Sequence, residues 1–455
     1  MEIYLYWNSE IEISSYPNGA NLLEVKNFTE SEILVKRNTQ FYQINDVASE
    51  ILQLFNGEKT YKEVIDILSE KYNELFETVN HKVDKFLKNI KDTYNIYLIE
   101  QNVSQKRNIK TLLSSSLYPI VATIEVTDRC NLKCRHCYGN YKKTNINNMS
   151  LEQIKKLLQD LKNIGVRIIE LTGGEVTTHP NIEEIIEYAL AMDFESVTIL
   201  SNGVSMSKKL LNILKKNKEK ICIQIDLHSL NEKYMTWFTG RSNIIDSIKK
   251  NISVIAESDI RMRVITIITK HNMQEIEEIA DYVHEVGARQ YAASLVIPMG
   301  RAMGESDLLL DEADLKMLDK VMTRINKKYE GFLSIIRDGA QRSINCGCLT
   351  SNVVISPIGN IKICAMNSLK DINCNIGNVF REDIKMIYDR QSEFFGAFYD
   401  AKAPKMYLEE CKECENASYC HGCMLRGLSK AKLIGGKCLW YNTQISPVIK
   451  AKLGY

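Results

Sequence analysis

The sequence predicts an α/β protein with a parallel sheet in the middle of the chain. Between residues 115 and 300, short β-branched runs alternate with amphipathic stretches that have helical spacing. The strand-like runs are Ile120–Val126, Arg167–Thr172, Ser196–Ser201, Ile221–Leu227, Met262–Ile268 and Gln290–Leu295. The first helix pattern, Leu151–Ile164, follows Ser150 and has Gln153 three residues after that serine, a capping-box arrangement. Parallel strands need helical crossovers, so six βα repeats indicate one parallel sheet.

Polar motifs follow the first four predicted strands. Thr127–Cys137 comes after the first strand and Gly173–Glu175 after the second. Ser201–Gly203 closes the third, and Asp226–Ser229 lies at the end of the fourth. The carboxyl ends of parallel strands carry the functional groups of α/β proteins. The four motifs therefore predict one site along one edge of the sheet.

Residues 1–110 predict a small winged-helix-like α+β domain. Strand-like runs, including Ile33–Val35, precede three helix candidates, and Thr60 with Glu63 caps the second. Their apolar faces are Val47, Ala48, Ile51, Leu52 and Phe55, then Val64, Ile65, Ile67 and Leu68, then Val83, Phe86, Leu87 and Ile90. A strand-like Ile96–Ile99 follows, and the polar, basic segment Gln101–Ser116 is expected to be the linker to residues 111–310.

Residues 311–345 predict a helical connector, and residues 346–455 a cysteine-rich domain with a turn at Pro357–Asn360. Nine of the thirteen cysteines lie after residue 345. Clustered cysteines in a chain without a secretion signal favour metal ligation over disulfides. Cys222, in an apolar strand, and Cys374 are expected to be plain thiols.

The composition is that of a soluble globular protein with two or three domains. The 455 residues are 45% hydrophobic and 25% charged, and 58 Lys and Arg nearly balance 57 Asp and Glu. This balance argues against a general nucleic-acid or membrane-surface role. The start, Met1–Glu10, has no signal-peptide pattern, and no apolar stretch is long enough to cross a bilayer. We expect a cytoplasmic protein with no nucleic acid and no membrane insertion.

The spacing Cys130-x3-Cys134-x2-Cys137 supplies three thiolates. A 4Fe–4S cubane has four irons, so one iron stays open to a small chelating molecule. A zinc site, which favours four protein ligands, or a group of free thiols is the alternative. The loop resembles that of the radical S-adenosylmethionine (radical SAM) enzymes. The resemblance implies a partial (β/α)6 barrel, S-adenosylmethionine on the open iron, and a 5′-deoxyadenosyl radical that abstracts hydrogen from the substrate.

The same resemblance implies which residues contact S-adenosylmethionine. The GGE triplet is expected at the methionine amino group, three polar residues at the ribose hydroxyls, and a histidine beside adenine. These residues are Gly173, Gly174 and Glu175, then Ser201, Asn202 and Asp226, and finally His136. His136 is expected to pack rather than to act as an acid or base. Ser201, Asn202 and Asp226, each taken alone, are more often turn or cap residues, and no residue stands out as a proton donor or acceptor.

The tail resembles the SPASM domain, which holds two auxiliary 4Fe–4S clusters, over about residues 340–440. Family assignment implies an outer cluster on Cys411, Cys414, Cys420 and Cys438 and an inner cluster on Cys346, Cys364 and Cys423, with Cys348 as its candidate fourth ligand. If Cys348 does not bind, the inner cluster keeps an iron open to a substrate thiolate. Only His421–Gly422 separate Cys420 from Cys423, where the family has three residues, so the local turn must differ. A zinc ribbon on Cys411, Cys414, Cys420 and Cys423 is the alternative.

Residues 1–110 resemble the PqqD-like RiPP recognition element, which binds the leaders of ribosomally made precursor peptides as an added strand. The alternative is a DNA-reading winged helix. Over nearly its whole length the chain is similar to sactipeptide maturases of the subtilosin type. The likeness lies in Thr127–Cys137, Leu171–Glu175, Ile355–Gly359, Tyr419–Cys423 and Arg426–Leu428.

These resemblances imply an oxidoreductase of bacteriocin maturation that forms Cys sulfur-to-carbon thioethers, of the sactipeptide or ranthipeptide type. Its partners would be a precursor peptide with a leader and a Cys-containing core, and an electron donor such as flavodoxin or ferredoxin. The auxiliary clusters would accept the second electron of the oxidation. Two alternatives stay open. One is a radical SAM maturase that performs C–C crosslinking, epimerisation or decarboxylation, and the other is a zinc-stabilised peptide-binding or regulatory protein.

Overall fold

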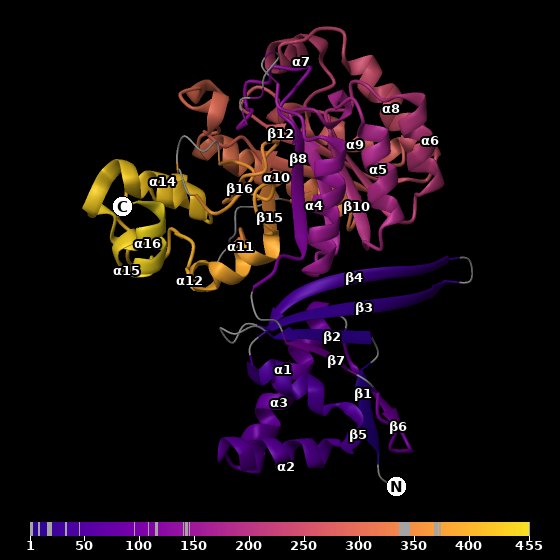
Figure 1. Ribbon diagram of the computed structural model, residues 1–455, viewed down its shortest axis with the longest axis vertical. Coiled ribbons are helices and arrows are strands. Elements are labelled where there is room, and N and C mark those ends of the chain that lie inside the picture. Colours follow the sequence, from indigo (N-terminus) through magenta and orange to yellow (C-terminus); the bar gives the residue numbers. More distant parts are fainter. Residues whose placement is uncertain are drawn as a thin grey trace. The chain divides into compact units, whose positions relative to one another are not determined.

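The computed structural model describes residues 3–454 except 8–9, 16–20, 32–33, 45, 95, 108, 114–116, 140, 142–143, 145, 336–345, 368–371 and 373–374. The chain divides into two compact units, Met1–Leu117 and Tyr118–Tyr455 (Figure 1). None of the helices in these described stretches is long and apolar enough to span a membrane.

The first unit combines two small sheets with three helices. The sheet orders are β5-β1-β6 and β4-β3-β2-β7. The strands are β1 (Tyr4–Trp7), β2 (Glu10–Ser15), β3 (Asn21–Ser31), β4 (Leu34–Ile44), β5 (Asn56–Thr60), β6 (Leu98–Gln101) and β7 (Lys110–Leu113), and the helices are α1 (Asp46–Leu54), α2 (Tyr61–Tyr72) and α3 (Phe76–Tyr94). The predicted cap of α2 is present, because Thr60 Oγ1 accepts from Glu63 N at 3.3 Å and Thr60 N donates to Glu63 Oε2 at 2.7 Å.

The core of the first unit forms around Trp7. Its indole donates to Leu52 O at 2.8 Å, and its ring meets Phe55 edge-on at 6.0 Å. Two expectations for this unit differ from the structure. The predicted linker contains β7, which pairs in parallel with β2, and the strand expected at Ile96–Ile99 starts two residues later. In the predicted run Ile33–Val35, the first residue lies outside the described residues and the other two belong to β4.

One sheet organises the described part of the second unit. Its order is β14-β13-β12-β11-β10-β9-β8-β15-β16, with neighbours parallel except for the last pair. The strands are β8 (Val121–Thr127), β9 (Ile168–Gly173), β10 (Ser196–Ser201), β11 (Ile221–Asp226), β12 (Arg261–Ile268), β13 (Gln290–Leu295), β14 (Leu333–Ile335), β15 (Asn352–Ile355) and β16 (Ile361–Lys362). The six predicted strands match β8–β13 to within one residue at each end, which confirms the predicted α/β class.

The two faces of this sheet differ in polarity. Apolar side chains such as Leu171, Ile199 and Ile225 are fully buried, whereas their strand neighbours Glu170 and Gln224 are only half buried. The helices along the sheet are α4 (Leu151–Asn163), α5 (Ile182–Ala191), α6 (Lys208–Lys216), α8 (Ile245–Glu257) and α9 (Ile276–Glu285) (Figure 1). Strands covered by helices on both faces would be apolar throughout. The alternation therefore indicates that the second face of β9, β10 and β11 is polar and only partly covered.

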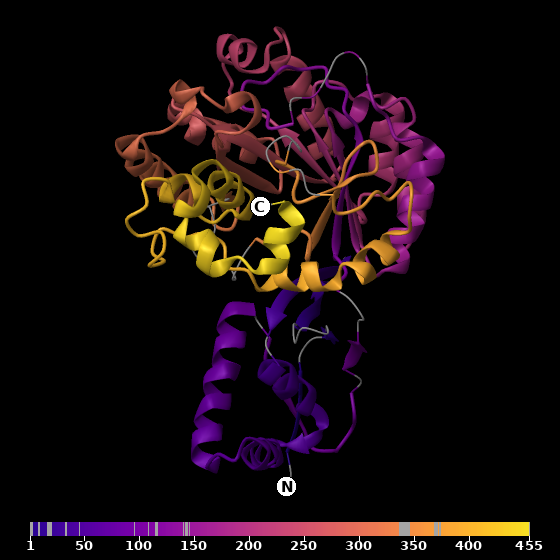
Figure 2. The same cartoon turned by 60° about the vertical axis from the view of Figure 1, so that its left-hand side comes forward.

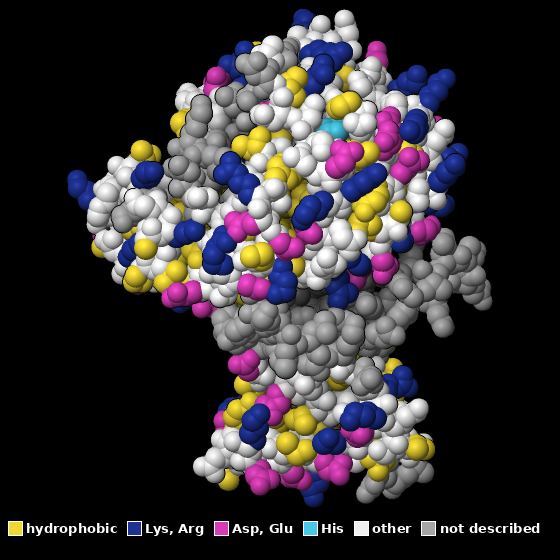
Figure 3. All heavy atoms as spheres, viewed as in Figure 1, with side chains coloured by type: hydrophobic (Ala, Val, Ile, Leu, Met, Phe, Trp, Pro, Cys, Tyr) yellow, Lys and Arg dark blue, Asp and Glu magenta, His cyan; other side chains and the backbone are white. Residues whose placement is uncertain are grey.

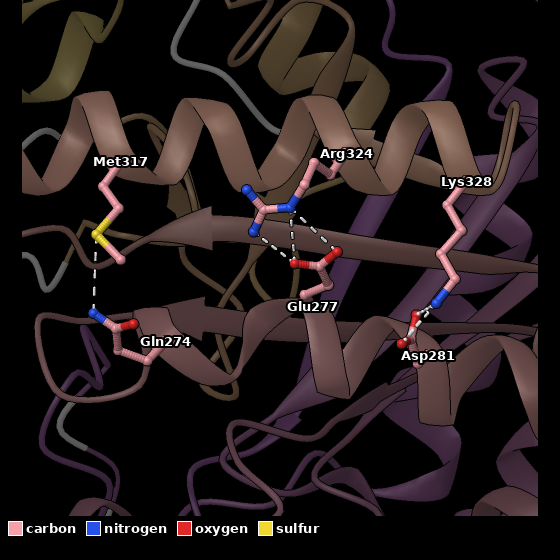
Figure 4. Close-up of polar contacts among 6 residues, drawn as sticks. All are labelled: Gln274, Glu277, Asp281, Met317, Arg324 and Lys328. Carbon is pink, nitrogen blue, oxygen red and sulfur yellow. Dashed lines mark hydrogen bonds and ion pairs between the residues drawn. The ribbon is translucent and has the colours of Figure 1, made fainter.

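The predicted connector begins with α10 (Glu312–Lys328), which packs on α9. Polar contacts link the two helices: Arg324 lies 2.6 Å from Glu277, Lys328 lies 2.8 Å from Asp281, and Gln274 donates to the sulfur of Met317 (Figure 4). These ion pairs are largely exposed, so solvent and salt screen them and they contribute little to stability. On the face of the second unit in Figure 3, basic and acidic side chains are interspersed.

The carboxyl-terminal residues share their core with the sheet. β15 pairs in parallel with β8, from Asn352 opposite Val121 to Ile355 opposite Ile124. The helices are α11 (Ile384–Arg390), α12 (Ser392–Asp400), α13 (Ala417–Cys420), α14 (Met424–Ile434), α15 (Leu439–Gln444) and α16 (Pro447–Leu453). They gather beside the sheet, in orange and yellow in Figure 2. Their large buried side chains, including Trp440, belong to the same continuous cluster as the sheet residues.

The amino-terminal cap of α4 provides a test of the local fold. Ser150 Oγ accepts from Gln153 N at 3.2 Å, and Ser150 N donates to Gln153 Oε1 at 2.8 Å. We expect Ser150→Ala to lower the free energy of unfolding by about 1 kcal/mol, because the first turn loses its acceptor. Urea denaturation monitored by circular dichroism measures this change. Ser150→Asp keeps an acceptor and should remain close to the unsubstituted protein; an equal loss in both variants would contradict the capping role.

Candidate functional site

The GGE turn after β9 holds one side of the cysteine loop. Gly174 N donates to Thr127 O at 2.8 Å, and Glu175 N donates to Arg129 O at 2.7 Å. A Cβ on Gly174 would lie 2.1 Å from Arg129 O, and one on Gly173, whose φ is +150°, would lie 2.3 Å from Thr127 O. Neither position can hold a side chain without moving the loop. The two glycines therefore fix how closely β9 approaches the loop.

Helix α7 (Glu232–Thr239) and the segment after β13 hold the other side of the loop. Both contribute main-chain or guanidinium hydrogen bonds to it. These are Lys133 N to Thr239 O at 2.8 Å, Arg135 N to Phe238 O at 2.8 Å, Arg301 N to Cys137 O at 2.9 Å and Arg301 Nε to Cys134 O at 2.8 Å. The Arg135 side chain forms an ion pair with Glu305 at 2.6 Å. The backbone of the loop is thus held by elements on both sides of it.

The three loop cysteines form no disulfides, and their charges act on one another. Burial, with the charges of Glu175 and Cys137, raises the pKa of Cys130 to about 11, and burial, with the other two loop thiols, raises that of Cys134 well above its usual value. When unbound, the thiols of Cys130 and Cys134 therefore stay protonated near pH 7, and a cation that binds them would stabilise the thiolates. Three soft sulfur donors in one loop fit an iron–sulfur cluster.

Glu175 and two other predicted cofactor residues, Ser201 and Asn202, lie in one buried network. Its carboxylate accepts from Ser201 Oγ, from Asn202 N and from Thr177 Oγ1, each at 2.7 Å. Asn202 Nδ2 in turn donates to Asn131 Oδ1, in the cysteine loop, at 2.7 Å. Burial raises the pKa of Glu175, although these hydrogen bonds oppose the shift. The ends of β9 and β10 are thus tied to each other and to the cysteine loop.

Asp226 ends β11 on the polar face of the sheet. Burial, and then the charge of Glu175, raise the pKa of its carboxyl to about 7. The charge of Asp226 also raises the pKa values of Cys134 and Tyr138, so Asp226 lies near the cysteine loop. The structure therefore brings residues from all four predicted motifs to one edge of the sheet; their contacts with S-adenosylmethionine stay predictions.

His136 packs among aromatic rings. It stacks on Phe238 with centroids 4.8 Å apart and meets His228 edge-on at 4.9 Å. Its Nδ1 is buried without a hydrogen-bond partner. Burial, and then the charge of Arg301, lower its pKa to about 4, so the ring is neutral near pH 7. Sequence reasoning missed Phe238, although the aromatic run in α7 was a visible signal.

The tail cysteines form two groups. Burial and then neighbouring thiols raise the pKa values of Cys411, Cys420 and Cys438. The charge of Cys414 contributes to the rise at each of these three. In the second group, the pKa of Cys348 is raised by the charges of Cys346, Cys364 and Cys423. These are the members predicted for the outer and inner clusters, whereas a zinc ribbon would place Cys423 with the first group. Whether they bind iron stays a prediction.

Cys348 lies inside the inner group. Its thiol donates a hydrogen bond to Cys346, which lowers the pKa of Cys346 to about 6 and raises that of Cys348. Among the residues that the structure describes, no three His, Cys, Asp or Glu side chains lie close enough together to bind a single metal ion. Ligands of a cubane are spaced more widely, because each thiolate binds a different iron. Cys374 lies outside the described residues, and Cys222 is half buried on β11.

A buried ion pair that sequence reasoning missed connects the two cysteine regions. Lys362 Nζ, on β16, lies 2.8 Å from Glu125 Oε1, on β8, and these side chains are only 6% and 3% exposed. Lys362 also donates to Ala365 O at 2.9 Å, and Tyr141 donates to Glu125 at 3.1 Å. Several hydrogen bonds are needed to offset the desolvation of such a pair. A glutamate within an otherwise apolar strand was the signal available in the sequence.

Comparison with known proteins identifies the second unit. The family model for the radical SAM superfamily matches residues 124–283. Residues 124–283 therefore form a radical SAM domain. In the first unit, the model described as coenzyme PQQ synthesis protein D (PqqD) matches residues 31–93.

The similarity extends to whole proteins. The chain is 29% identical over 458 residues to the antilisterial bacteriocin subtilosin biosynthesis protein AlbA of Bacillus subtilis, covering 99% of each chain. It is 26% identical over 221 residues to the sporulation killing factor maturation protein SkfB of the same species, covering 49% of this chain and 53% of SkfB. The fold resembles that of Streptococcus suis SuiB bound to precursor peptide SuiA, with a TM-score of 0.60, 17% identity and coverage of 92% and 95%. The predicted resemblance to sactipeptide maturases is confirmed.

The GGE turn generates the first prediction for this site. We expect Gly174→Ala to displace the cysteine loop and to remove the iron of one cluster out of three, because the new methyl group meets Arg129 O. Iron analysis after anaerobic reconstitution measures the loss. Gly436→Ala is the matched control, since nothing lies within 4 Å of its Cβ. Full iron content in Gly174→Ala would show that the close approach is not required.

The buried ring of His136 generates a second prediction. Its folded pKa of about 4 lies below its usual 6.5. Between these values the unfolded chain binds a proton that the folded chain does not, so stability falls as pH decreases from 6.5 to 4. We expect His136→Phe to keep the stacking on Phe238 and to reduce this loss. The urea concentrations at the midpoint of unfolding, at pH 7 and at pH 5, measure this loss of stability. The same pH dependence in His136→Phe as in the unsubstituted protein would contradict the burial of a neutral ring.

Proposed function

We propose that this enzyme forms Cys sulfur-to-carbon thioether crosslinks in a ribosomally made precursor peptide. The observation that carries the proposal is the presence of two groups of tail cysteines on the same core as a radical SAM loop. A radical SAM loop alone supports hydrogen abstraction. Additional cluster sites are what an oxidation without oxygen requires. The similarity to subtilosin biosynthesis protein AlbA over 99% of both chains supports the same chemistry.

The loop cysteines Cys130, Cys134 and Cys137 would hold the first cluster. Bound there with S-adenosylmethionine, it would supply a 5′-deoxyadenosyl radical, the species that takes a hydrogen atom from a carbon of the peptide. The chain's own contribution is to position these groups. The two glycines fix the loop, and the Glu175 network fixes the ends of β9 and β10 beside it. Asp226 and the rings around His136 would line the nucleoside.

Thioether formation removes two hydrogens from the peptide. One leaves carbon as an atom, the other leaves the cysteine sulfur as a proton, and closing the S–C bond releases one electron. The inner group, Cys346, Cys348, Cys364 and Cys423, would hold the nearer acceptor of that electron. The outer group would hold the next one. The β8–β15 pairing and the Lys362–Glu125 ion pair connect the inner group to the strand that leads into the radical SAM loop.

The first unit would bind the leader of the precursor. Its similarity to PqqD over residues 31–93 supports this assignment. Its two small sheets present edge strands, β4 and β7 in one and β5 and β6 in the other, and an extended peptide binds by adding a strand to such an edge. A flavodoxin or ferredoxin would supply the first electron. With these partners and reduced clusters, the reaction would take place in the cytoplasm.

The test uses the full chain, reconstituted without air, with dithionite, S-adenosylmethionine and the Cys-containing peptide encoded beside its gene. We expect 5′-deoxyadenosine and a peptide that has lost two hydrogens per crosslink, with the corresponding thiols closed to alkylation. Mass spectrometry before and after iodoacetamide measures both. A product of unchanged mass with free thiols would point to epimerisation, and loss of two hydrogens with free thiols to C–C crosslinking. Release of no 5′-deoxyadenosine would reject the radical mechanism.

A further inference from the structure

Arg426 is a buried cation between the two groups of tail cysteines. It lies in the first turn of α14, which begins directly after Cys423, and only 5% of the residue is exposed. Its guanidinium donates to His421 O at 2.9 Å and lies 5.9 Å from the centre of the Tyr419 ring. The side chain is therefore held in the short turn that separates Cys420 from Cys423.

The backbone of Arg426 reaches both of these cysteines. Arg426 N donates to Cys423 Sγ at 3.4 Å, and Cys420 Sγ lies 4.0 Å from Arg426 O. Cys423 belongs to the inner group and Cys420 to the outer group. The guanidinium is fixed on His421 O at 2.9 Å, in the turn between these two cysteines. One positive charge thus lies beside a predicted ligand of each cluster site.

A positive charge of this kind favours the reduced state of a cluster. Reduction adds an electron, and a nearby cation stabilises the added negative charge more strongly where water is excluded. Hydrogen bonds to cluster sulfurs act in the same direction. Cys423 receives such a bond from Arg426 N and also caps the amino terminus of α14, the positive end of the helix dipole.

We propose that Arg426 raises the reduction potentials of both auxiliary clusters and so makes them acceptors for the electron released when the S–C bond closes. This inference rests on the proposed function, because it assumes clusters on the tail cysteines. In the proposed step, the inner group would hold the cluster that accepts the electron, the cysteine thiol would give its proton to water, and the outer group would hold the cluster that passes the electron on to a flavodoxin or ferredoxin. Arg426 takes no part in bond making and acts only through its charge.

The test measures the potentials directly. The full chain carries Cys130→Ala, Cys134→Ala and Cys137→Ala, so that the signals come from the auxiliary clusters alone. Arg426→Gln, Arg426→Lys and the control Lys430→Gln are compared by redox titration with electron paramagnetic resonance, with iron analysis of each sample. Lys430 is a matched control because it is on the same helix, 5.7 Å from the same Tyr419 ring.

We expect both potentials to fall in Arg426→Gln and to stay close to the original in Arg426→Lys and Lys430→Gln. A tenfold change in the ratio of reduced to oxidised cluster corresponds to about 59 mV for a one-electron couple. Arg426→Gln with full iron and unshifted potentials would overturn the proposal, as would an equal shift in Lys430→Gln. If Arg426→Gln loses iron, Arg426→Lys is the deciding variant. A large fall in its reduction potentials, although the positive charge is retained, would exclude a charge effect.

A second readout separates this proposal from the proposed function. In the chain with its loop cysteines intact, Arg426→Gln should still release 5′-deoxyadenosine but form less crosslink per molecule released. If the unsubstituted tail holds zinc or gives no auxiliary cluster signal, the proposed function fails. If those signals are present and only the effect of Arg426 is missing, this inference alone fails.

Discussion

The parallel pairing of β15 with β8 is the constraint on which the arrangement of the whole second unit depends. It makes the strand before the radical SAM loop the direct neighbour of the first strand of the cysteine-rich tail. The main-chain hydrogen bonds of this pairing leave little freedom in the distance between the two regions. The buried Lys362–Glu125 ion pair extends the same connection to β16, two residues before Cys364.

The polarity of the second sheet face follows from the same architecture. One layer of helices buries alternate residues of β9, β10 and β11, and the remaining residues, among them Glu170 and Asp226, lie on the opposite face. The fold therefore separates its two tasks, since one side of each strand supplies stability and the other side supplies the chemistry.

Local patterns predicted the strands and the caps, because each depends on residues close together in the chain, whereas the two cysteine groups were predicted from the resemblance to the SPASM domain. Alternation along β10 and the Ser150–Gln153 spacing specify their structures almost alone. The features that were missed depend on contacts between distant segments. β7 becomes a strand only by pairing with β2, and Glu125 meets Lys362 across 237 residues. Phe238 becomes part of the site only because α7 lies against the cysteine loop.

The single apolar core shared by sheet and tail limits how such proteins can exchange parts. A chimera that took its carboxyl-terminal segment from a relative would have to replace Asn352–Ile355 in register with β8, and a donor lacking the lysine would leave the buried Glu125 without its ion-pair partner. The tail is thus not a detachable module. Diversification of these enzymes should instead be easiest in the first unit, which has a core of its own.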